Sequence, residues 1–141
     1  GVTVDEFQHE VYENPELTPQ ERRMKWLEVE RKYLPSRYYE EIPELDEGLF
    51  FYRQGHLFSV PFYYIDYTLA QVCAFQFWKK ANENREKAWA EYLHLCKQGG
   101  TKPFLELVKE ANLENPFKDG TISNIVPELR KYIDSVDTSE F

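Results

Sequence analysis

The chain has 141 residues, and its 25 aspartates and glutamates outnumber its 17 lysines and arginines, which gives a net charge of −8 at pH 7. This length is sufficient to bury a hydrophobic core. The negative charge argues against binding to nucleic acid or to anionic lipid, because both require a basic face. The mean hydropathy is −0.66, and no apolar run approaches the roughly 20 residues that span a bilayer. We therefore predict no nucleic-acid partner and no membrane role.

The cysteine content predicts a reduced protein. Cys73 and Cys96 lie on separate predicted helices and form neither a C-x-x-C pair nor a disulfide framework. The first residues do not resemble a secretion signal, which would combine basic and apolar stretches with a small-residue cleavage site. We expect buried, free thiols and a cytoplasmic location.

Residues 1–34 are predicted to form two leading helices. Apolar residues recur at helical spacing in the first helix, which ends before Pro15 because the residue preceding a proline disfavours the helical conformation. The second helix has a clear start: Thr18 is a good N-cap, Pro19 suits the first helical position, and Glu21 completes a capping box.

The rest of the chain is divided by changes in composition. Residues 35–60 are first acidic and then apolar, which predicts a connection followed by a loop that other material covers. Residues 61–82 begin with a proline, contain no further proline or glycine, and are apolar on most sides, so we expect a central helix inside a larger body. Residues 83–136 are predicted to hold the C-terminal helices. The prediction is an all-α fold of about five helices in a single domain over residues 1–141.

One group of hydrogen-bond donors is predicted around the start of the central helix. Tyr64 and Tyr67 are three residues apart and therefore share a helical face, and His56 precedes them on the predicted loop. Donors that converge in this way can hold a peptide carbonyl or a developing oxyanion. Tyrosines at such positions more often pack half-buried with the hydroxyl in water. Spacing alone therefore leaves both roles open.

No metal site is predicted in this chain. His9 and Glu10 begin like the zinc-binding pattern H-E-x-x-H, but the position of the second histidine is occupied by Glu13. Two possible ligands on one helical face make a weak zinc site, and a solvated helix face is the simpler interpretation.

Three segments of the chain are similar to segments of one known family. The segment R-Q-G-H-L-F-S-V-P-F-Y-Y-I-D-Y-T-L-A-Q, Arg53–Gln71, resembles the substrate-binding segment of the oligoendopeptidase F family, a group of zinc metallopeptidases in the thimet-oligopeptidase superfamily. The segment V-D-E-F-Q-H-E-V-Y-E-N-P, Val4–Pro15, is similar to the helix that follows the catalytic core. The segment L-E-L-V-K-E-A-N-L-E-N-P-F-K-D-G-T, Leu105–Thr121, is similar to the C-terminal helices.

The resemblance implies specific roles for the donor group. His56 matches a histidine that contacts bound peptide near the scissile bond, and Tyr67 matches a tyrosine that hydrogen-bonds the tetrahedral oxyanion. Tyr64 matches a neighbouring tyrosine that helps to hold the substrate. The resemblance thus implies that His56 and Tyr67 are catalytic and that all three residues bind substrate, with residues 35–60 including the substrate loop.

The resemblance also implies that the zinc ligands and the general base of the family lie outside this chain, because H-E-x-x-H is absent from it. The chain is then the C-terminal portion of a zinc-dependent oligoendopeptidase that hydrolyses short peptides. Its partners are short peptide substrates and the N-terminal part of the same enzyme, and the chain alone is expected to be inactive and to bind no zinc. The alternative is a non-catalytic helical module that binds peptides or proteins.

Overall fold

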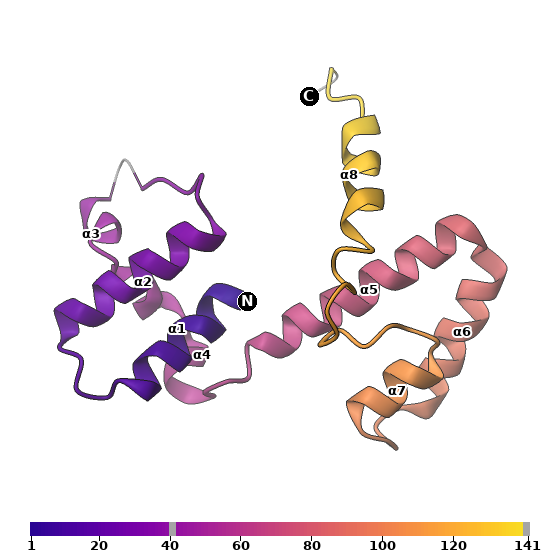
Figure 1. The fold of residues 1–141 in the computed structure, drawn as a ribbon, viewed down its shortest axis with the longest axis horizontal. Coiled ribbons are helices and arrows are strands. Elements are labelled where there is room, and N and C mark those ends of the chain that lie inside the picture. The colour runs from indigo at the N-terminus through magenta and orange to yellow at the C-terminus, as the bar shows by residue number, and fades with distance from the viewer. Residues whose placement is uncertain (40–41, 140–141) are drawn as a thin grey trace. The chain divides into compact units, whose positions relative to one another are not determined.

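A computed structural model describes residues 1–39 and 42–139, and all the regular structure within these residues is helical (Figure 1). The predicted all-α fold class is confirmed. The chain divides into two compact units, residues 1–68 and 69–141, and each unit is described by itself. The elements in chain order are α1 (Val2–Glu13), α2 (Pro19–Tyr33), α3 (Pro43–Asp46), the 3₁₀ helix η1 (Leu49–Arg53), α4 (Gly55–Ser59), α5 (Ile65–Glu83), α6 (Arg85–Gln98), α7 (Phe104–Glu110) and α8 (Val126–Ser135).

The predicted number of about five helices is too low. The additional elements within the described residues are short: α3 has four residues, and η1 and α4 have five residues each. They lie in residues 35–60, which were predicted to be a connection and a loop. Single helical turns of this length have no hydrophobic periodicity of their own, so the sequence pattern gives little sign of them.

Helix α2 begins as the sequence predicts. The backbone N–H of Glu21 donates to Thr18 Oγ1 over 3.3 Å, and the backbone N–H of Thr18 donates to Glu21 Oε2 over 2.7 Å. This reciprocal pair satisfies two backbone donors that have no partner inside the helix. It also places negative charge near the positive end of the helix dipole.

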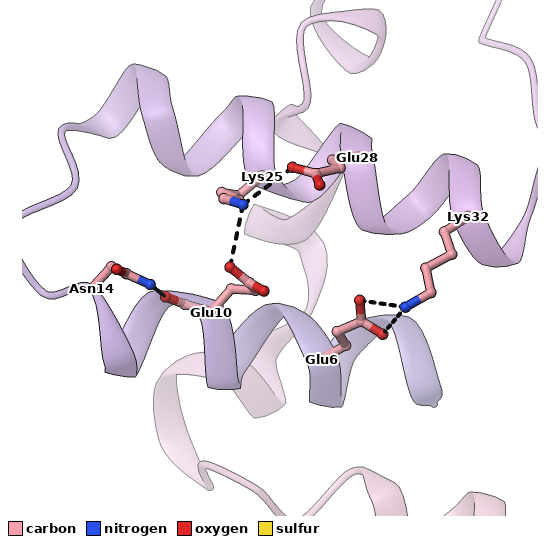
Figure 2. A network of polar contacts seen from close by, with 6 residues as sticks. All are labelled: Glu6, Glu10, Asn14, Lys25, Glu28 and Lys32. Atoms are coloured by element: carbon pink, nitrogen blue, oxygen red, sulfur yellow. Dashed lines mark hydrogen bonds and ion pairs between the residues drawn. The ribbon is translucent and has the colours of Figure 1, made fainter.

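Charged side chains connect α1 and α2 along their exposed edges (Figure 2). Lys32 Nζ lies 2.8 Å from Glu6 Oε1, and Lys25 Nζ lies 3.3 Å from Glu10 Oε2 and 3.2 Å from Glu28 Oε2. Exposed ion pairs of this kind contribute little to stability. Two of these pairs join different helices, so they favour one alignment of α1 against α2.

The core of the first unit consists of aromatic rings from three elements. Phe7 of α1 packs edge-on against Trp26 of α2, with ring centroids 5.2 Å apart, and lies 4.9 Å from Phe51 of η1. Trp26 is 1% exposed. Edge-to-face aromatic pairs add stabilisation beyond the area that they bury. The apolar segment before residue 55, predicted to need a cover, is thus partly covered by the chain's own first two helices.

Gly48 allows the chain to approach α2 closely before it enters η1. Its φ angle is +84°, and a Cβ atom at this position would lie 2.3 Å from the carbonyl oxygen of Arg23. The left-handed conformation disfavours any residue with a side chain, and the contact with α2 leaves no room for one. Both constraints at this one position determine where η1 packs.

The central helix begins later than predicted. The sequence placed its start at Pro61, whereas α5 begins at Ile65 and ends at Glu83. Phe62 has φ +59°, a left-handed conformation that a right-handed helix cannot contain. Pro61 therefore lies in a turn between α4 and α5. The predicted loop around His56 also differs from the structure, because that residue lies within α4.

The second unit is built around a smaller apolar cluster. Val108, Ala111 and Leu113 are buried, and the partly buried side chains of Cys73, Phe77 and Leu95 pack against them. Gln76 of α5 is also buried. It accepts the backbone N–H of Glu114 over 2.7 Å and donates to the carbonyl of the same residue over 3.0 Å.

Neither Thr101 nor Thr121 caps a helix in the second unit. Their hydroxyls donate to the carbonyls of Gln98 and Asn115. Helix α8 begins only at Val126. A threonine hydroxyl can donate a hydrogen bond to a carbonyl of the preceding turn and then does not cap the helix that follows.

The two cysteines lie on α5 and α6. Cys73 and Cys96 are both free, as predicted, but the former is only half-buried and the latter is exposed, so the prediction of buried thiols is wrong. Within residues 1–39 and 42–139, every helix is too short or too polar to cross a bilayer.

We expect Gly48→Ala to destabilise the chain by at least about 1–2 kcal/mol, the usual cost of a left-handed conformation for a residue with a Cβ atom, because the clash with Arg23 adds to that cost. Gly55→Ala is the control: a Cβ there meets no atom within 4 Å, and alanine favours a helix. Urea unfolding followed by tryptophan fluorescence measures both variants. Equal midpoints for the two variants would contradict the assigned role of Gly48.

Candidate functional site

His56 lies on α4, between η1 and the turn that leads to α5. The hydroxyl of Ser59 donates to the carbonyl of Gly55 over 2.8 Å, which closes this single helical turn. The neighbouring Leu57 packs against the aromatic core of the first unit. The half-buried imidazole therefore lies on a short helix, α4, and Leu57 fixes this helix to the core.

The three residues predicted from the sequence lie together. The ring centroid of His56 is 4.7 Å from that of Tyr64 and 6.0 Å from that of Tyr67. The two tyrosine rings are 5.3 Å apart, in an edge-to-face arrangement. We call His56, Tyr63, Tyr64 and Tyr67 the aromatic cluster. The spacing of three residues in sequence thus gives adjacent rings, although Tyr64 comes just before α5 and not within it.

Tyr63, which the sequence analysis did not single out, belongs to the same cluster. Its ring centroid lies 5.6 Å from that of Tyr67 and 6.4 Å from that of His56. A hydrogen bond to Tyr63 raises the pKa of Tyr67, and the charges on Tyr64 and Asp66 act in the same direction. Tyr63 precedes α5, so helical spacing does not account for its place in the cluster.

The cluster borders an open depression of about 400 Å³. Arg53 lines it and was not singled out from the sequence. This cation lies 5.7 Å from the ring of Phe50 and gives the depression a positive charge beside the imidazole. The full lining is Arg53, Gln54, Gly55, His56, Ser59, Val60 and Tyr64. A depression with a cation, an imidazole and a phenol hydroxyl can accept a polar, carbonyl-rich ligand such as a peptide.

His9, considered above as a possible zinc ligand, lies on α1. Within the described residues, no three His, Cys, Asp or Glu side chains are grouped closely enough to hold a metal ion. The imidazole of His9 lies 3.5 Å from Asp5 and faces the ring of Phe62. The sequence interpretation of a solvated helix face fits this arrangement, because the His9 side chain is 57% exposed.

The second unit contains a separate, more apolar depression of about 510 Å³ between side chains of α5 and α6. Trp89 and Tyr92 are its most prominent aromatic walls, and both are exposed. The lining is Phe77, Trp78, Ala81, Arg85, Glu86, Ala88, Trp89 and Tyr92. It has a single pair of opposite charges and no imidazole, so it lacks the convergent donors of the aromatic cluster.

Comparison with known proteins identifies the family. A family model described as peptidase family M3 matches residues 1–126. The chain belongs to peptidase family M3. The match includes α1, α2 and the whole aromatic cluster of this M3 chain. No curated protein sequence matches it.

Three solved structures are similar to the M3 chain. A protein described as an oligoendopeptidase F is 56% identical with a TM-score of 0.89, and PZ peptidase A with an inhibitor is 54% identical with a TM-score of 0.89. In both cases the match covers 96% of this chain and 24% of the other. An oligoendopeptidase F from Bacillus anthracis is 45% identical with a TM-score of 0.74, covering 99% of this chain and 21% of that one. The M3 chain thus spans about a quarter of the length of these relatives.

We expect Tyr63→Phe to lower the pKa of Tyr67. The hydrogen bond between the two hydroxyls favours the protonated form of Tyr67, so its removal makes deprotonation easier. Tyr64→Phe is the matched control, because Tyr64 acts on Tyr67 only through a weaker charge effect, and it should cause a smaller decrease. An NMR titration of ¹³Cζ-labelled tyrosine measures the change. A pKa that is unchanged in Tyr63→Phe would contradict the assigned hydrogen bond.

Proposed function

We propose that the M3 chain is the C-terminal part of a zinc-dependent oligoendopeptidase that hydrolyses short peptides, and that it supplies substrate-binding and oxyanion-stabilising groups. The observation that carries this proposal is the aromatic cluster in a chain that matches family M3 over residues 1–126. Peptidase families act on peptides, and two of the similar structures are described as oligoendopeptidases.

The proposed roles follow from hydrogen-bond chemistry. A phenol hydroxyl donates to a carbonyl oxygen, and the bond strengthens as that oxygen becomes negative in the tetrahedral intermediate. We assign this role to Tyr67. A tyrosine hydroxyl is protonated at neutral pH, and the pKa of Tyr67 is raised above its ordinary value. His56 and Tyr64 border the depression, and we assign to them the contacts that orient the peptide near the scissile bond.

Zinc does not fit the side chains of this chain, because the described residues bring no three suitable ligands together. In metallopeptidases the metal supplies an activated water and polarises the scissile carbonyl. We therefore propose that zinc is held by residues of the complete enzyme outside this chain. The aromatic cluster then acts on the substrate and not on the metal.

We expect Tyr67→Phe in the complete enzyme to lower kcat about 10²–10³-fold, which is the usual effect of losing one oxyanion donor. His56→Ala should also lower kcat, because a peptide that is held out of position reacts more slowly. Michaelis–Menten kinetics on a fluorogenic short peptide measure the effect. Tyr52→Phe is the control, since Tyr52 is exposed and lies outside the cluster. Turnover within a few-fold of wild type in a folded Tyr67→Phe enzyme would remove the proposed role of that residue.

The metal dependence needs its own experiment. A zinc chelator should abolish hydrolysis by the complete enzyme, and added zinc should restore it. The isolated 141-residue chain should neither hydrolyse the peptide nor bind zinc tightly, because its described residues bring no three His, Cys, Asp or Glu side chains together. Specific peptide binding by the chain, combined with a complete protein that is inactive with zinc, would favour the alternative of a helical binding module.

A further inference from the structure

The turn between α4 and α5 contains an unfavourable backbone conformation. Phe62 has φ +59°, and it is one of two non-glycine residues with a positive φ angle among the described residues. Bulky residues rarely adopt this conformation, and it persists only where surrounding contacts enforce it. This turn separates His56 from Tyr64. Its conformation therefore determines how the imidazole lies against the tyrosine rings.

A buried side chain from the first helix holds this turn. Gln8 of α1 is 3% exposed, and its Oε1 atom accepts the backbone N–H of Phe62 over 3.2 Å. The two residues are 54 positions apart in sequence. The bond acts on the backbone of the residue with the positive φ angle, whereas the contacts of the Phe62 ring with His9 and Tyr12 act only on its side chain.

A buried glutamine that serves one loop amide is an unusual use of a core position, because a buried polar group without sufficient partners destabilises the fold. The Nε2 atom of Gln8 has no hydrogen-bond partner within the described residues. An apolar residue would fill the same space without this cost. The glutamine therefore contributes something other than packing, and the contact that it makes is with the turn of the aromatic cluster.

We propose that Gln8 is a positioning residue for the aromatic cluster: through its hydrogen bond to the amide of Phe62, it sets the orientation of His56 relative to Tyr64 and Tyr67. The consequence for catalysis rests on the proposed function, but the geometric part of the proposal does not. Gln8 touches no substrate in this scheme and acts only through the turn.

The geometric part is tested by NMR on the 141-residue chain. Gln8→Met removes the accepting oxygen and keeps the length of the side chain, whereas Gln8→Glu keeps an oxygen at the same position. The readout is the NOE between the ring protons of His56 and Tyr64, whose centroids are 4.7 Å apart. The chain has only three histidines, so the resonances of His56 can be assigned with a His56→Gln variant.

The matched control is Gln76→Met in the second unit. Gln76 is another buried glutamine that accepts a backbone N–H from a distant residue, Glu114, but it belongs to the other unit. We expect the NOE to be lost in Gln8→Met and retained in Gln8→Glu and Gln76→Met. An intact NOE in folded Gln8→Met would overturn the proposal, as would an equal loss in Gln76→Met.

A second variant covers the case in which Gln8→Met fails to fold. Replacing the amide of Phe62 by an ester, through incorporation of phenyllactic acid at this position, removes the donating N–H group, weakens the Pro61 carbonyl as an acceptor and leaves the sequence of α1 unchanged. The same NOE should then disappear while the far-UV circular dichroism stays that of the wild type. If the NOE persists in the ester variant, the hydrogen bond does not position the cluster.

The catalytic part is tested in the complete enzyme. Gln8→Met should lower kcat at least about 10-fold with a smaller change in KM. Displaced donors of the aromatic cluster would weaken the binding of the transition state more than the binding of the substrate. Gln8→Glu should recover most of the kcat. A loss of the NOE without a loss of kcat would leave Gln8 as the positioning residue and contradict the proposed function of the cluster, so the two failures are distinguishable.

Discussion

The packing of Phe7, Trp26 and Phe51 is the constraint on which the first unit depends. These rings come from α1, α2 and η1, so their contact fixes three elements at once. Leu57 and Tyr64, which flank the turn at Phe62, pack against the same core. The aromatic cluster therefore rests directly on the hydrophobic core. Close-packed interiors transmit small displacements, so a change in the packing of this core would shift the position of His56.

The cluster combines a local sequence with distant support. Its members lie within residues 56–67, so a short segment supplies all the rings. Their mutual orientation, however, depends on α1, through Gln8 and through the contact of the Phe62 ring with Tyr12. Elements this short do not hold a conformation by themselves, because helix nucleation is unfavourable and one turn gains few hydrogen bonds. The first helix thus supports the site without contributing a ring to the cluster.

Two tyrosines of the aromatic cluster are exposed to solvent in this chain, which affects how strongly they can stabilise an oxyanion. Tyr63 and Tyr67 are 47% and 52% exposed in this chain. A hydroxyl in contact with water stabilises an oxyanion much less than one in a site that excludes water, because the effective dielectric constant is higher. The proposed catalytic role therefore requires cover from the rest of a complete enzyme. The similar structures are about four times longer than the matched segment, which provides ample material for it.

The sequence by itself determined the features that depend on local chemistry. The all-α class, the C-terminal end of α1 and the capping box of α2 follow from helical periodicity, proline and hydrogen-bonding side chains, which act over a few residues. The three-residue spacing of Tyr64 and Tyr67 also favours their adjacency, although Tyr64 precedes α5. Only the tertiary structure decided that α5 begins at Ile65, that α4 carries His56 and that Tyr63 joins the cluster. These features depend on Gln8, Gly48 and the aromatic core, whose contacts join residues far apart in the chain and leave no periodic pattern in the sequence.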